Sequence, residues 1–167
     1  MFISIVQHAP RWVWFVLVGL LALGASQLFP RRISVQRATL LPIVLAAVSS
    51  YGVVITFAQA QLALAAWAAG ITAALALTSV LKVWRGITWS ARDARLVVPG
   101  SWVPMLLIMA RFSVKFGVGA CLALGPSLAH DPGFAATVGL VYGGFSGVFL
   151  GRSLVMWQVA RQGMQTR

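Results

Sequence analysis

Two cations lie near the middle of an apolar segment that is long enough to cross a bilayer. The segment is Ser101–Leu124, and it carries Arg111 and Lys115 but no Asp or Glu. Residues four apart lie on one face of a helix, one turn above the other. A charged side chain at mid-bilayer costs about 3 kcal/mol on insertion scales, so it normally faces a bundle interior or an aqueous cavity.

This pair of cations predicts an anion site inside a helical bundle. A bound carboxylate, phosphate or anionic lipid head group would offset both the repulsion between the cations and the cost of burying them. Tyr142 and Ser146 share one face of a later apolar segment and are candidates to supply hydroxyl groups. In an alternative interpretation, Lys115 reaches outward to the membrane surface, and Arg111 donates to backbone carbonyls or to the polar face of a neighbouring helix.

The other titratable residues indicate no second reactive centre. His8 and His130 are isolated from other metal-binding residue types, and Cys121 is the single cysteine, predicted to be a small buried residue. Asp93 and Asp131 are the only acids, and the topology derived below puts them on opposite sides of a membrane. The sequence therefore predicts no metal, no cofactor and no catalytic constellation.

The composition is that of a multi-pass membrane protein. The chain has 167 residues, of which 60% are hydrophobic and only 9% charged, against about a quarter charged in soluble domains. Its mean hydropathy is +0.90. The net charge of +11 does not indicate a nucleic-acid partner, because the basic residues are spread over short connections between apolar runs. The predicted partner is the lipid bilayer, and the length suits a single membrane domain over residues 1–167.

Apolar runs separated by proline and polar residues predict an all-α integral membrane bundle of five transmembrane helices. The predicted spans cover approximately residues 12–29, 38–58, 62–81, 101–124 and 134–157. Residues 82–100 are the one long polar interval, with short β-compatible runs at 87–89 and 96–98. We expect a small β-hairpin there, with Trp84 and Trp89 dipping into the lipid head groups; an irregular loop is the alternative.

The distribution of lysine and arginine predicts the orientation of the chain. With the N-terminus outside, every basic residue of the connections except Arg11 falls on the inner side. Arg152, near the inner end of the last span, can then extend its side chain to the surface. The N-terminus is therefore predicted to be periplasmic and the C-terminus cytoplasmic.

Small residues recur every four positions in two of the predicted spans and indicate close helix packing. They are Gly139, Gly143, Gly147 and Gly151 in the last span, and Ala66, Gly70 and Ala74 in the third. This pattern supports an alternative to anion binding or translocation. In that alternative the protein is a structural or accessory subunit, and the glycine stripe assembles it with itself or with a partner.

Three short stretches resemble a known family of proteins. They are His8-Ala9-Pro10, the PGSWVP stretch at Pro99–Pro104, and Lys115-Phe116. The chain resembles a family of small, uncharacterised bacterial inner-membrane proteins, described as a domain of unknown function. The resemblance covers nearly the whole chain. It implies a five-helix bundle in the bacterial inner membrane, with Pro99, Gly100, Ser101, Trp102 and Lys115 as family-like positions, and it carries over no activity.

Overall fold

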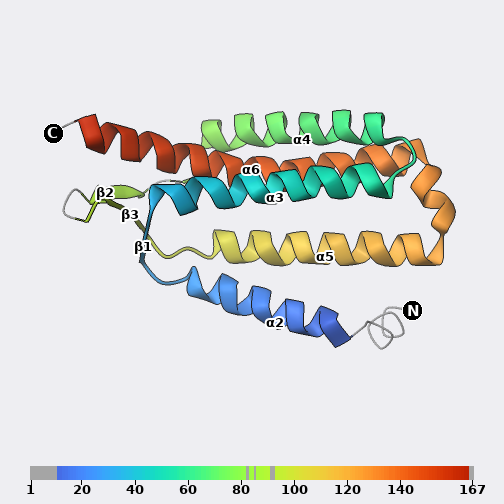
Figure 1. Cartoon of the computed structure of the whole chain (residues 1–167), viewed down its shortest axis with the longest axis horizontal. Coiled ribbons are helices and arrows are strands. Elements are labelled where there is room, and N and C mark those ends of the chain that lie inside the picture. The colour runs from blue at the N-terminus through green and yellow to red at the C-terminus, as the bar shows by residue number, and fades with distance from the viewer. Residues whose placement is uncertain (1–10, 82, 85, 91–92, 166–167) are drawn as a thin grey trace. The chain divides into compact units, whose positions relative to one another are not determined.

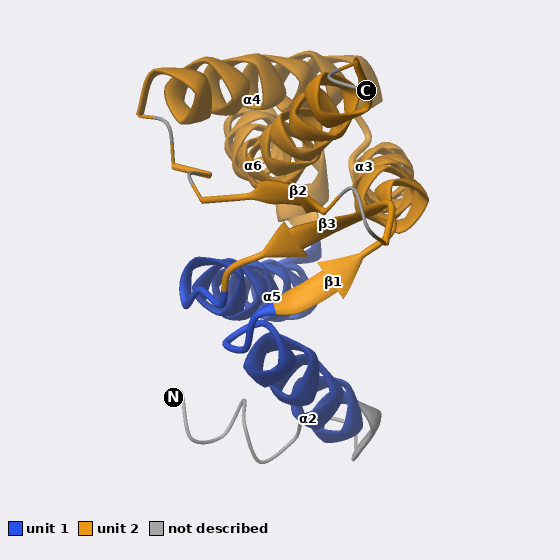
Figure 2. Ribbon diagram, turned by 90° about the vertical axis from the view of Figure 1, so that its left-hand side faces the viewer, with its two compact units in different colours: residues 1–30, 100–126 blue, residues 31–99, 127–167 orange. Residues whose placement is uncertain are grey.

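The computed structural model describes residues 11–81, 83–84, 86–90 and 93–165, and the chain divides into two compact units. Unit 1 comprises residues 1–30 and 100–126, and unit 2 comprises residues 31–99 and 127–167 (Figure 2). The described residues are mainly helical, with one small β-sheet in unit 2 (Figure 1). His8 and the rest of the leader lie outside the described residues, as do Lys82, Arg85, Arg92 and Arg167.

Unit 1 contains two apolar helices, α2 (Arg11–Ser26) and α5 (Val103–Leu124). α2 ends where the amides of Gln27 and Leu28 turn back to carbonyls three residues earlier, just before Pro30. It has 16 residues and is about 24 Å long, less than the hydrocarbon core of about 30 Å. The prediction of a span over residues 12–29 therefore exceeds the helix that forms. Among the described residues, four helices are long and apolar enough to cross a membrane.

Unit 2 contains three long helices, α3 (Val35–Thr56), α4 (Ala60–Leu81) and α6 (Pro132–Gln165). Their ends lie within three residues of the predicted ones, except that α6 continues eight residues past the predicted end at position 157. The extension is helical because Gln, Arg and Met favour helices and no proline interrupts them. With 34 residues, α6 is about 51 Å long, well beyond the thickness of a hydrocarbon core.

A three-stranded antiparallel sheet lies at one end of unit 2. Its strands are β1 (Arg31–Ile33), β2 (Thr88–Ser90) and β3 (Arg95–Val98), in the order β1-β3-β2. The expected pairing of β2 with β3 is confirmed, with Trp89 opposite Leu96. β1 was not predicted from the sequence; its residues follow the predicted end of the first span at position 29. Its pairing with β3 joins the start of α3 to the hairpin.

The core of unit 2 lies between this sheet and the C-terminal part of α6. Leu96 is fully buried, and it forms a cluster with Val98 of β3, Met156 and Ala160 of α6, and Ala38 of α3. On the exposed side of the sheet, the guanidinium of Arg32 forms an ion pair with Asp93. The packing of Leu96 and Val98 against Met156 and Ala160 therefore attaches the sheet to the C-terminal part of α6.

The opposite end of unit 2 is closed by its two helix connections. The amide of Ala58, after α3, donates to the carbonyl of Ala129, before α6, at 3.1 Å. Phe57 and Phe134 pack edge to face with their ring centroids 6.0 Å apart. Asp131 accepts from the amide of Phe134 in the first turn of α6 and so caps that helix. All arginines that the structure describes in unit 2 lie away from this end, near the sheet.

The four predicted glycines of α6 face α4 of the same chain. Gly139, Gly143, Gly147 and Gly151 lie in order against Ala63, Trp67, Ile71 and Thr78, so α4 and α6 run parallel. On α4, Gly70 contacts the backbone at Leu140 and Gly144, Ala74 lies beside Gly147, and Ala66 is half-buried. Because α4 covers the stripe, an oligomer assembled on it lacks the free surface that the alternative function requires.

A side chain of α6 compensates for a proline within α3. Pro42 has no N–H and cannot donate to the carbonyl of Ala38, four residues earlier. The hydroxyl of Ser153 donates to that carbonyl at 2.8 Å, and both Ser153 and Ala38 are buried. The bond therefore satisfies a carbonyl that the helix cannot satisfy itself, and it fastens α3 to α6.

Candidate functional site

The four residues predicted to form an anion site are divided between the two units. Arg111 and Lys115 lie on α5 in unit 1, where Lys115 is exposed and Arg111 is half-buried with its Nη1 shielded from solvent. Tyr142 and Ser146 lie on α6 in unit 2. The hydroxyl of Ser146 donates to the carbonyl of Tyr142 at 2.9 Å, so its proton is already used within the helix. An anion site formed by these four residues stays a prediction.

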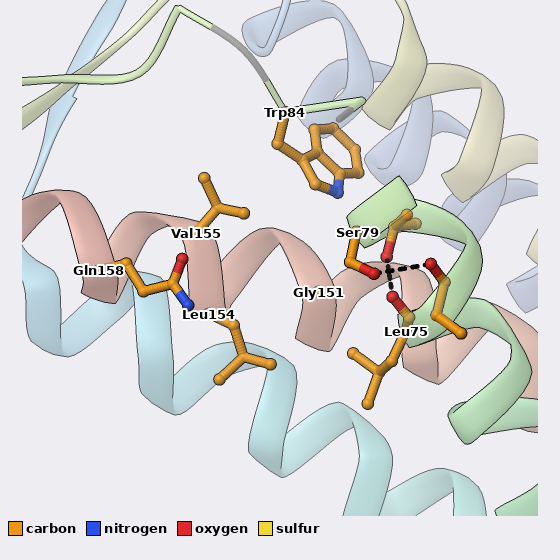
Figure 3. Close-up of a pocket in the computed structure, with 9 residues that line it drawn as sticks. Leu75, Ser79, Trp84, Gly151, Leu154, Val155 and Gln158 are labelled. Atoms are coloured by element: carbon orange, nitrogen blue, oxygen red, sulfur yellow. Dashed lines mark hydrogen bonds between the residues drawn. The ribbon is translucent and has the colours of Figure 1, made fainter. Parts of the chain in front are cut away.

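Unit 2 itself holds a groove of about 600 Å³ between α4 and α6 near the sheet (Figure 3). Its volume lies within the range of about 300–1,000 Å³ that is usual for ligand pockets. Leu75 and Ser79 of α4 line one side, and Leu154, Val155 and Gln158 of α6 line the other. Most of the lining atoms are carbon, so the groove suits the apolar part of a ligand.

Trp84 forms the polar wall of this groove. Only 8% of its surface is exposed, yet its Nε1 has no hydrogen-bond acceptor among the described residues. In Figure 3 the indole ring stands over the end of α4, with its nitrogen directed toward Ser79. Burying an N–H without an acceptor costs about 1–3 kcal/mol, and such groups are rare in native proteins. An oxygen atom of a ligand in the groove would remove this cost.

Positive charge is concentrated beside Trp84. The guanidinium of Arg152 lies over the Trp84 ring, 5.1 Å from its centroid, and it is repelled by the charge of Arg31 in β1. Burial lowers the pKa of Arg31 from its ordinary value. Both carboxylates of the chain are engaged elsewhere, Asp93 with Arg32 and Asp131 at the start of α6. This end of the groove therefore attracts anions.

The hydroxyl groups of the groove are already hydrogen-bonded within α4. The hydroxyls of Thr78 and Ser79 donate to carbonyls of α4, at 2.8 Å to Ala74 and 2.7 Å to Ala76. Neither hydroxyl has a general base beside it among the described lining residues, which include no His, Asp, Glu or Lys. Within the described part of the chain, no three His, Cys, Asp or Glu side chains gather in a possible metal site.

Sequence reasoning did not single out Trp84 and Arg152 as a site. Trp84 was expected among the lipid head groups, and Arg152 was expected to extend to the surface. One signal was present, because Arg152 is the sole charged residue between Pro132 and Ala160. An ionisable residue in an apolar helix marks a functional site by default.

The sequence profile of a family of unknown function (DUF6622) matches residues 1–166 of the chain. No curated protein and no solved structure matches the chain.

Proposed function

The chain belongs to this family of unknown function, and we propose its role from the groove. The proposed role is that of a multi-pass membrane protein that binds an anionic lipid beside Trp84. The observation that carries the proposal is the buried Trp84 Nε1, which has no acceptor among the described residues and borders a largely apolar groove. The proposed role is binding, because among the described residues that line the groove neither Thr78 nor Ser79 has a general base beside its hydroxyl.

The position of the groove along α6 supports a lipid as the ligand. About 20 helical residues cross a hydrocarbon core, so a span that begins near Pro132 reaches the far boundary near Arg152. The groove lies at that level, between Gly151 and Gln158 on α6. Apolar walls on the membrane side and cations at the boundary match an acyl chain joined to an anionic head group.

Recognition would then combine a hydrogen bond with charge. The Trp84 N–H donates to an oxygen of the phosphate or of an adjoining ester, and the hydrogen bond is stronger when that oxygen is charged. Arg152 and Arg31 supply the positive potential that distinguishes an anionic from a zwitterionic lipid. Arg152 also orients the indole through its contact with the ring.

We expect Trp84→Phe to retain about tenfold less phosphatidylglycerol than the wild type does, because the substitution removes a hydrogen bond to a charged group. The substitution keeps an aromatic ring under Arg152. The measurement is native mass spectrometry of protein released from mixed micelles of the two lipids. The matched control is Trp102→Phe, because Trp102 is 66% exposed and lies in the other unit.

Equal retention of phosphatidylglycerol by the wild type and Trp84→Phe would refute the role of Trp84. A wild type that retains both lipids equally would refute anionic-lipid binding altogether.

We further propose five membrane spans, with α2 as the first, in the inner membrane of a bacterium. The N-terminus is outside and the C-terminus inside. The charge distribution supports this orientation, since the sheet end of unit 2 carries the arginines.

In a Cys121→Ser background and right-side-out vesicles, we expect an impermeant maleimide to label Ser127→Cys fully. Thr88→Cys should be labelled only after the vesicles are opened. Labelling of Thr88→Cys in sealed vesicles would contradict this orientation and would place the sheet end of unit 2 outside.

A further inference from the structure

A second, smaller groove lies on the other flank of α6. It has a volume of about 280 Å³ and is lined by Thr39 and Ile43 of α3 and by Leu150, Leu154 and Trp157 of α6, among others. Nearly all of its surface is carbon. Because it lies between α3 and α6, whereas the first groove lies between α4 and α6, the two grooves flank the same helix.

Leu154 is the ridge between the two grooves. Its side chain lines both of them and is 50% exposed. In Figure 3 it points away from Trp84, toward α3. Toward the C-terminal end of α6 the first groove reaches Gln158 and the second reaches Trp157, which are consecutive residues of that helix. The two grooves thus end at the same level on faces of α6 about 100° apart, and they converge toward Arg161, which lies one turn beyond both of these residues.

This point of convergence is polar and positively charged. The guanidinium of Arg161 lies 5.1 Å from the centroid of the Trp157 ring, one turn beyond the end of the second groove. Gln158 and Arg161 are both exposed on the same face of α6. Two apolar grooves that meet at a charged rim match a lipid with two chains and one anionic head group.

We propose that the lipid bound beside Trp84 is a two-chain phospholipid that straddles Leu154, with one acyl chain in each groove. This inference rests on the proposed function and adds the number of chains and the path of the second one. A single-chain lipid would leave one groove without its dispersion contacts. A lipid tail gains little hydrophobic free energy on leaving other lipid tails, so packing in the grooves must supply the preference.

The test compares phosphatidylglycerol with its single-chain lyso form, offered together at equal concentration in detergent micelles. From the lost contacts of one chain we expect the wild type to retain the two-chain form about fivefold better, measured by native mass spectrometry. We expect Ile43→Trp, which fills the second groove, to remove most of this preference. The matched control is Val44→Trp, because Val44 is 47% exposed on α3 and lines neither groove.

The outcomes separate this inference from the proposed function. Ile43→Trp should keep the preference for phosphatidylglycerol over phosphatidylcholine, because Trp84 and Arg152 are intact. If the chain-number preference is the same in the wild type, Ile43→Trp and Val44→Trp, the straddling lipid is refuted while anionic binding stands. If the wild type does not distinguish phosphatidylglycerol from phosphatidylcholine, both proposals fail. Should Ile43→Trp not fold, Thr39→Phe fills the same groove from one turn earlier in α3.

Discussion

Gly143→Ala is expected to lower the free energy of unfolding by about 3 kcal/mol or more, because there is no room for a methyl group between α4 and α6. A Cβ at this position would overlap the carbonyl oxygen of Trp67 and crowd its Cα at 2.9 Å. These are backbone atoms of α4, so no side-chain rotation relieves the overlap. The two helices must move apart along the contact that holds unit 2 together. Denaturation in mixed micelles with increasing sodium dodecyl sulfate measures the change.

Gly144→Ala is the matched control for this prediction. The same substitution one residue later puts a Cβ where no atom lies within 4 Å. Replacing glycine by alanine within a helix favours folding by about 1 kcal/mol. We therefore expect Gly144→Ala to leave stability unchanged or raise it slightly. If the two variants have the same free energy of unfolding, α4 and α6 do not make this close contact at Gly143.

Ser153→Ala is expected to lower the free energy of unfolding by about 1–3 kcal/mol, because it removes the donor from a buried carbonyl. The carbonyl of Ala38 depends on the Ser153 hydroxyl, since Pro42 offers no N–H. In a Pro42→Ala background, the new amide at position 42 bonds to Ala38 within α3. The effect of Ser153→Ala should then fall below about 1 kcal/mol, which gives a coupling that a double-mutant cycle measures.

Ser50→Ala serves as the control for this cycle. The hydroxyl of Ser50 donates at 2.9 Å to Ala47, within the same helix and away from any proline. Its removal should have little effect in either background. Equal losses from Ser153→Ala with and without Pro42 would contradict the proposed compensation.

Hydropathy predicted the bounds of α3, α4 and α5 to within three residues. α4 and α5 begin within two residues of their predicted starts, because Gln59 and Pro99-Gly100 interrupt the pattern. α2 is shorter than predicted, because hydropathy cannot detect the turn that the amides of Gln27 and Leu28 make.

β1 had no signal in the sequence. It has three residues, too few to establish an alternating pattern, and two of them are arginines that read as the end of a span. Its partner strand begins at Arg95, far along the chain. Such a strand is specified by pairing and not by local propensity, so only the folded chain reveals it.

The candidate site had one signal in the sequence, the isolated charge of Arg152, but nothing in the sequence linked Arg152 to Trp84. Arg152 and Trp84 are 68 residues apart, and each one has an ordinary explanation at a membrane boundary when it is read alone. The groove itself depends on the parallel packing of α4 and α6, and the glycines predicted that close packing without predicting its partner. Steric fit between helices is a tertiary property, which residue periodicity does not contain.

The extension of α6 fixes the distance between the groove and the N-terminal end of this helix. The sheet is attached to the last third of α6 through Met156 and Ala160, and Asp131 caps the first turn. Because α6 is one continuous helix, the distance between the groove and the first turn of the helix is fixed. The groove therefore cannot shift along α6 when the bilayer thickness changes. If α6 spans the membrane as proposed, a thicker bilayer would place Gln158 and Arg161 closer to the hydrocarbon, and a thinner one would leave the proposed acyl-chain walls in water. Under the proposed function, we therefore expect lipid occupancy of the grooves to depend on hydrophobic mismatch.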